Sequence, residues 1–161
     1  MNSKHHIIDY VYLVVFILLS GLILFFASTS GEVSSNQSSM LVDFTTAFLN
    51  IFNINLDGQA SANLHTFIRK AIGHFGLFML DGIFGLLSGR AWLKYKETTI
   101  FIIVMSAGVF IASLSEVLQL LAPERGPSFA DVLLDVFGYF IGVAFIYLIL
   151  RLLKKNKKAT G

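Results

Sequence analysis

Residues 116–142, with the sequence EVLQLLAPERGPSFADVLLDVFGYFIG, decide how the rest of this chain is arranged. Two apolar segments flank a short turn that contains Pro123 and Gly126, and both segments carry carboxylates. Glu116 and Gln119 are three residues apart, so they share one face of a helix. The stretch therefore predicts two apolar helices that meet at a tight turn and carry carboxylates toward the same end.

The second of these segments begins with a helix-capping pattern. Ser128 stands three residues before Asp131, which is the spacing of a capping box with Asp in place of the usual Glu or Gln. Asp131, Asp135, Gly138 and Gly142 then follow at helical spacing on one face. We expect the two glycines to allow close approach of a neighbouring helix.

The whole chain is apolar enough to lie in a membrane. Of its 161 residues, 55% are hydrophobic, whereas soluble domains have about 45–50% apolar residues even with glycine included. Four segments reach the roughly 20 residues that cross a hydrocarbon core about 30 Å thick. They cover about residues 7–27, 68–88, 98–122 and 129–150. We therefore predict an all-α membrane protein, in which one domain over residues 1–161 forms a bundle of four transmembrane helices.

The basic residues predict an orientation for this bundle. Nine of the twelve Lys and Arg residues lie before the first span, between the second and third, or in the tail 151–161. Residues 28–65 contain none. Because basic residues collect on the cytoplasmic side, both termini are expected in the cytoplasm. The loop 28–67 and the turn 123–128 are then expected outside the cell.

The first loop combines two kinds of sequence. Residues 28–39 are small and polar, and they predict a flexible linker. In residues 40–52, apolar side chains recur at steps of three and four, which is typical of an amphipathic helix at the membrane interface. These side chains are Leu41, Phe44, Phe48 and Phe52. Residues 53–63 are expected to form a loop, with a turn at Asp57-Gly58.

Ionisable residues of three predicted spans reach the same depth. Counted from the nearer helix end at 1.5 Å per residue, His74 lies about 7–8 Å deep, Glu116 about 9 Å and Asp135 about 10 Å. We therefore predict a polar pocket that opens outward, and we expect Glu116 to contact a basic residue because unpaired charge is costly there. The basic residues at its mouth are Arg69, Lys70 and Arg125.

Asp81 lies deeper than these residues. It is about 18 Å below Arg69 on the same helix, close to the middle of the bilayer. It is expected to face the interior of the bundle and to have a partner, or else to be protonated. A proton or ion relay through Asp81 is one functional hypothesis.

These polar residues resemble the signature of the VanZ-like family of small bacterial membrane proteins. The resemblance covers roughly residues 67–142, with Asp135 where an Asn is expected and Leu77-Phe78 where a Glu-Tyr pair is frequent. It rests on Arg69-Lys70, His74, Glu116-x-x-Gln119, Arg125, Ser128-x-x-Asp131 and Gly138-x-x-x-Gly142. It implies a link to teicoplanin-type glycopeptide resistance, as for the family's namesake.

Binding of an envelope ligand is the first functional hypothesis. The basic mouth would grip a phosphate or carboxylate while the helix faces hold an acyl chain, as in a membrane lipid, a lipid-linked cell-wall precursor or a lipoglycopeptide. The candidate ligand-binding residues are Arg69, Lys70, His74, Glu116, Gln119, Arg125, Ser128, Asp131 and Asp135.

A membrane-embedded enzyme is the alternative. His74 would act as general acid or base, with Glu116 or Asp131 orienting it and Arg125 stabilising developing negative charge. No cofactor and no metal site are expected: His74, Glu116 and Asp131 could together ligate a metal ion, but no HExxH-type spacing supports this. We expect no nucleic-acid partner and leave the oligomeric state open. A purely structural role, in which the basic residues neutralise the carboxylates, is the remaining interpretation beside binding, catalysis and the relay.

The predicted orientation is testable because the chain contains no natural Cys. In intact cells, an impermeant thiol reagent should label Ser35→Cys and should not label Thr160→Cys. The reverse labelling would overturn the orientation and place the polar pocket at the inner leaflet.

Overall fold

The computed structural model describes residues 6–126 and 128–159, which are helical apart from short connections. The helices are α1 (Ile7–Ser28), α2 (Gly31–Ile51), α3 (Gly58–Ile68), the π-helix η1 (Arg69–Gly76), α4 (Leu77–Trp92), α5 (Glu97–Leu121) and α6 (Phe129–Ala159). Four continuous helical segments, namely α1, α3–α4, α5 and α6, are long and apolar enough to cross a membrane. The predicted all-α fold with four spans is confirmed.

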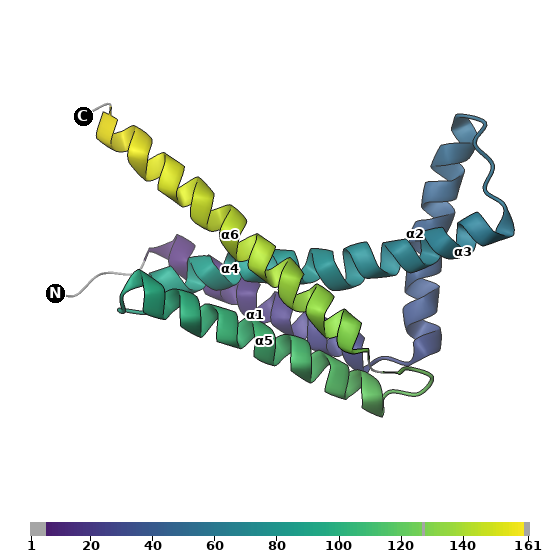
Figure 1. The fold of residues 1–161 in the computed structure, drawn as a ribbon, viewed down its shortest axis with the longest axis horizontal. Coiled ribbons are helices and arrows are strands. Elements are labelled where there is room, and N and C mark those ends of the chain that lie inside the picture. The colour runs from purple at the N-terminus through teal and green to yellow at the C-terminus, as the bar shows by residue number, and fades with distance from the viewer. Residues whose placement is uncertain (1–5, 127, 160–161) are drawn as a thin grey trace.

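α4 is the central helix of the bundle, because it packs against α1, α5 and α6. The start of α1 and the end of α6 lie at one end of the molecule, and the α5–α6 turn lies at the other (Figure 1). We call the second end the turn end. α2 runs across the turn end at a steep angle to the bundle helices (Figure 1). In a membrane crossed by the bundle, α2 would therefore lie roughly along the surface.

Glycines bring α6 against the η1–α4 helix at backbone distance. A Cβ atom at Gly142 would collide with the carbonyl oxygen of Met79, and one at Gly138 would collide with that of Phe75. From the other side, a Cβ at Gly82 would collide with the carbonyl oxygen of Tyr139. The interpretation of Gly138 and Gly142 as packing residues is confirmed, since small residues permit this approach.

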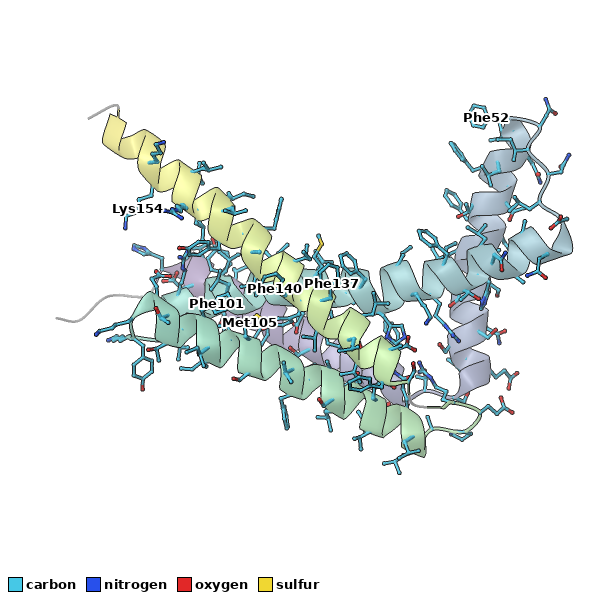
Figure 2. All side chains as sticks on the ribbon, in the orientation of Figure 1. Phe52, Phe101, Met105, Phe137, Phe140 and Lys154 are labelled. Atoms are coloured by element: carbon cyan, nitrogen blue, oxygen red, sulfur yellow. The ribbon has the colours of Figure 1, made fainter. Side chains whose placement is uncertain are left out.

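The bundle has an apolar interior and an apolar exterior. Ile23 of α1, Phe78 of α4, Val104 of α5 and Val143 of α6 are buried together. On the outside, apolar side chains stay exposed, as expected of helices whose surroundings are lipid. They include Phe101, Phe137 and Phe140, which are labelled in Figure 2.

The prediction of a flexible linker over residues 28–39 is wrong, because α2 begins at Gly31. Ser30 caps this helix by accepting a hydrogen bond from the Val33 backbone N–H at 3.4 Å. The Gly31 N–H donates to the Pro123 carbonyl at 2.9 Å, which ties the start of α2 to the α5–α6 turn. A helix cap and a tertiary contact thus order a segment whose composition alone favours a linker.

The second span also starts earlier than predicted. Asp57 caps α3 by accepting a hydrogen bond from Ala60 N–H at 2.7 Å, and the helix runs for 35 residues from Gly58 to Trp92. At 1.5 Å per residue this is about 50 Å, compared with a hydrocarbon core of about 30 Å. The first turns therefore project beyond the bundle, and the predicted loop 53–63 ends at Asp57.

The close contact between α4 and α6 predicts a large cost for a single methyl group. Gly142→Ala should lower the free energy of unfolding by about 1–3 kcal/mol, because the Met79 backbone cannot move aside. Gly21→Ala is the matched control, since nothing lies within 4 Å of a Cβ at that position. Thermal unfolding in detergent, followed by circular dichroism, measures both. Equal midpoints for the two variants would contradict the packing described.

Candidate functional site

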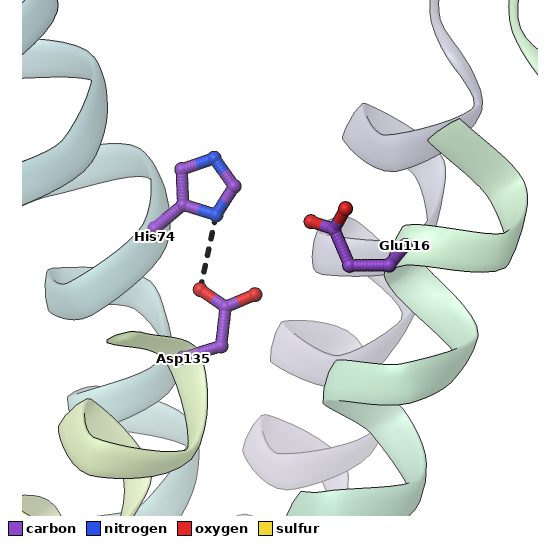
Figure 3. Close-up of side chains that lie close together, drawn as sticks. All are labelled: His74, Glu116 and Asp135. Carbon is purple, nitrogen blue, oxygen red and sulfur yellow. Dashed lines mark hydrogen bonds and ion pairs between the residues drawn. The ribbon is translucent and has the colours of Figure 1, made fainter. Parts of the chain in front are cut away.

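A buried polar cluster lies where η1, α5 and α6 meet, and it consists of His74, Glu116 and Asp135 (Figure 3). His74 Nδ1 lies 3.0 Å from Asp135 Oδ1. One nitrogen or carboxylate oxygen from each residue lies within 4.8 Å of the others. The three residues are 8%, 5% and 0% exposed, respectively. The structure thus brings together the residues that depth counting placed in one layer, and we call them the central cluster.

Glu116 is held by neutral donors. Gln119 Nε2 donates to its Oε1 at 2.9 Å, and the Ser128 backbone N–H donates to its Oε2 at 2.8 Å. Among the described residues, no Lys or Arg nitrogen lies within 4.0 Å of this carboxylate. The prediction that Glu116 contacts Arg69, Lys70 or Arg125 is therefore wrong at ion-pair distance. The Glu116 carboxylate is satisfied instead by hydrogen bonds from the Gln119 amide and from the backbone N–H of Ser128 at the start of α6.

The capping pattern at the start of α6 is shared between two helices. Ser128 Oγ accepts a hydrogen bond from Asp131 N–H at 3.3 Å, as a capping residue does. The reciprocal bond is missing, because the Ser128 N–H donates to Glu116. The Asp131 carboxylate instead pairs with Lys70 Nζ at 3.0 Å. Asp135, and neither Glu116 nor Asp131, is therefore the carboxylate that orients His74, which corrects the enzyme hypothesis.

Arg125 joins the α5–α6 turn to the end of α1. It donates to the Phe26 carbonyl at 2.7 Å and to the Thr29 carbonyl at 3.5 Å. Partial burial lowers the pKa of Arg125, and the neighbouring charge of Arg69 lowers it further, whereas Glu116 and Asp131 act in the opposite direction. Arg69 and Arg125 therefore lie close enough for their positive charges to repel each other. An anion bound between the two guanidinium groups would relieve this repulsion.

The π-helix η1 helps to explain how Arg69 and His74 come to face the same space. In an α-helix, residues five apart point in different directions. The i to i+5 bonding of a π-helix widens the turn and brings such residues to one side. Lys70, one position later, reaches Asp131 on α6. Sequence reasoning missed this segment.

Two cavities adjoin the central cluster. One of about 380 Å³ is mainly apolar, with Ile23, Leu41 and Phe78 in its wall. The other, of about 440 Å³, is mainly polar and lies between the start of α2 and the α5–α6 turn, next to Glu32 and Glu124. Five polar side chains line both cavities: Ser34, Arg69, His74, Gln119 and Arg125. The site is therefore amphipathic, with a shared polar boundary.

Asp81 occupies a separate position in the bundle. It is fully buried and accepts a hydrogen bond from Ser20 Oγ at 3.0 Å. The prediction that it faces the interior and has a partner is confirmed. Its Oδ2 and the hydroxyl of Tyr139 have no hydrogen-bond partner among the described residues. Neither cavity reaches Asp81, so the relay hypothesis gains no support from them.

Comparison with known proteins identifies a family for this chain. Residues 11–151 match the VanZ/LLP1 family. This range contains the central cluster, Arg69, Arg125 and most of each of the four spans. No curated protein and no solved structure shows significant similarity to the chain. Because the family match covers most of the chain, the protein belongs to the VanZ/LLP1 family.

Proposed function

We propose that the protein binds an amphiphilic ligand of the cell envelope at its turn end. Arg69 and Arg125 would hold the anionic head group, and the apolar cavity would hold the acyl chain. The observation that carries this proposal is the pair of adjoining cavities, one polar and one apolar, that share both arginines. An amphiphile needs this combination, whereas a soluble ion or a plain hydrocarbon would use only one cavity.

The arginines suit an anionic head group for two reasons. Guanidinium groups bind phosphate and carboxylate through two parallel hydrogen bonds. Arg69 is exposed and makes no ion pair within 4.0 Å among the described residues, so its donors remain available. Lys70, by contrast, is paired with Asp131. The apolar cavity, at about 380 Å³, falls within the usual range for ligand pockets of about 300–1,000 Å³.

The family and the predicted orientation narrow the class of ligand. With both termini in the cytoplasm, the two cavities would open at the outer leaflet. Lipid-linked cell-wall precursors and lipid-tailed glycopeptides both meet the membrane there. The family resemblance to a teicoplanin-resistance protein favours these ligands over bulk phospholipid. We accordingly propose a role in glycopeptide resistance of the teicoplanin type.

A catalytic role is the second candidate, and the buried His74–Asp135 pair favours it. A carboxylate 3.0 Å from Nδ1 fixes the orientation of the imidazole, which is how many enzymes position a general acid or base. Arg69 and Arg125 would then stabilise charge that develops on a head group. His74 lines both cavities, so it can reach a ligand in either.

Arg69→Gln should weaken binding of teicoplanin or of a lipid-linked precursor by about 10- to 100-fold, because a charge-assisted hydrogen bond contributes roughly 1.5–3 kcal/mol. Fluorescent ligand titrated into protein in lipid nanodiscs measures this. Arg151→Gln, at the opposite end of α6, is the matched control and should bind as wild type. Unchanged affinity in Arg69→Gln would contradict the proposed role of the arginines.

Mass spectrometry of the ligand separates binding from catalysis. After incubation with wild-type protein, a bound lipid-linked precursor should be recovered with its mass unchanged. If the protein is an enzyme, product should form, and His74→Ala should reduce its rate by about 10²–10⁴-fold. Product at equal rates in wild type and His74→Ala would contradict the catalytic alternative.

A further inference from the structure

We infer that the central cluster of His74, Glu116 and Asp135 is a binding site for one divalent transition-metal ion, with Zn²⁺ as the best match. One imidazole and two carboxylates are ligands that Zn²⁺ accepts. They come from three separate elements, η1, α5 and α6. Because the three ligands are far apart in the sequence, no short motif predicts the site. The inference goes beyond the proposed function and does not depend on it.

The distances fit a metal ion. Zn²⁺ lies about 2.0–2.2 Å from nitrogen and oxygen ligands, so two ligand atoms at tetrahedral angles are roughly 3.3 Å apart. His74 Nδ1 and Asp135 Oδ1 already lie 3.0 Å apart. The third ligand atom, from Glu116, lies within 4.8 Å of both partners. A spacing of up to 4.8 Å is longer than the roughly 3.3 Å between ligands of one ion, so Glu116 would move toward its two partners when the ion binds.

A second observation is the unsatisfied oxygen of Asp135. Oδ1 of this carboxylate pairs with His74, but Oδ2 is buried and has no hydrogen-bond partner among the described residues. In Figure 3, the second oxygen lies on the side of the carboxylate that faces Glu116. Because buried polar atoms nearly always have a partner, an unsatisfied carboxylate oxygen between two other metal-ligating groups points to a cation.

Charge balance gives a third argument. Asp135 and Glu116 are both buried, and within the described ranges neither has a Lys or Arg nitrogen within 4.0 Å. Arg125 acts on both Glu116 and Asp131 from longer range. A protonated His74 would cancel only one of the two negative charges. A divalent ion bound to neutral His74 cancels both, which removes most of the cost of burying them.

The surroundings supply what a metal site needs besides its ligands. Gln119 and the Ser128 N–H hold the two oxygens of Glu116, as outer-shell donors do for metal-bound carboxylates. His74 lines both cavities and Asp135 lines the apolar one, so an entry path exists. Three protein ligands leave a coordination position open, where water or an oxygen of a head group binds.

Metal binding by the full-length, untagged protein in detergent tests the inference. After loading with Zn²⁺ and desalting, mass spectrometry for metals should find about one ion per chain, as expected for a single site. Asp135→Asn and His74→Ala should lower the affinity by more than the roughly 10- to 100-fold that loss of an outer-shell partner costs. Asp81→Asn is the matched control, because Asp81 is equally buried but belongs to neither cavity. It should bind Zn²⁺ as wild type.

Two further measurements keep the result clear if a variant folds poorly. Zn²⁺ should raise the unfolding midpoint of wild type and of Asp81→Asn, and it should not raise that of Asp135→Asn. With Co²⁺ in place of Zn²⁺, the intense visible absorption of a four-coordinate ion should appear in wild type and should be lost in Asp135→Asn. Wild-type protein that is folded but binds no Zn²⁺, or binds it equally well after Asp135→Asn, would overturn the inference.

Discussion

The hydrogen bond from the Ser128 N–H to the Glu116 carboxylate is the contact on which the site depends. It lets α5 cap the start of α6, so the two helices of the last hairpin are fixed in register. Because Glu116 takes this donor, the Asp131 carboxylate is released from its capping role and pairs with Lys70. One turn further along α6, Asp135 then lies beside His74. Because Glu116 rather than Asp131 accepts the Ser128 N–H, the three carboxylates have three different partners. Glu116 bonds to Ser128, Asp131 to Lys70 and Asp135 to His74.

Burial makes these pairings consequential. In the interior of a membrane protein, a polar group without a partner costs far more than at a surface, since neither lipid nor water can replace the partner. Glu116, Asp131 and Asp135 together could not be tolerated as three free charges. The structure divides the problem among neutral donors for Glu116, an ammonium group for Asp131 and an imidazole for Asp135. What remains unsatisfied, the second oxygen of Asp135, is therefore the most informative atom of the site.

The sequence was sufficient to predict the number of spans and the depth at which the site lies, because both follow from helical rise. Twenty apolar residues cross a membrane, and residues at equal depth in neighbouring helices can meet. Depth counting therefore brought His74, Glu116 and Asp135 together without any motif. The same approach could not assign partners, because Asp131 and Asp135 differ by one helical turn and only the packed structure shows which one reaches His74.

Two other features were beyond prediction for different reasons. The π-helix η1 depends on i to i+5 backbone bonds, and nothing in its sequence, RKAIGHFG, marks the wider turn that these bonds produce. The early start of α2 depends on Pro123, which is more than ninety residues away. Local composition describes such a segment as a linker, since its ordering comes from a distant contact.

The contact of Arg125 with the end of α1 has a consequence for how the protein is made. The carbonyl groups of Phe26 and Thr29 are synthesised nearly a hundred residues before Arg125, which binds them. At about 5–20 residues per second, they wait for roughly 5–20 seconds. During that interval α1 can enter the membrane, but the start of α2 still lacks its hydrogen bond to the Pro123 carbonyl. The cavities become complete only when the last hairpin arrives, so a nascent chain has its helices before it has its site.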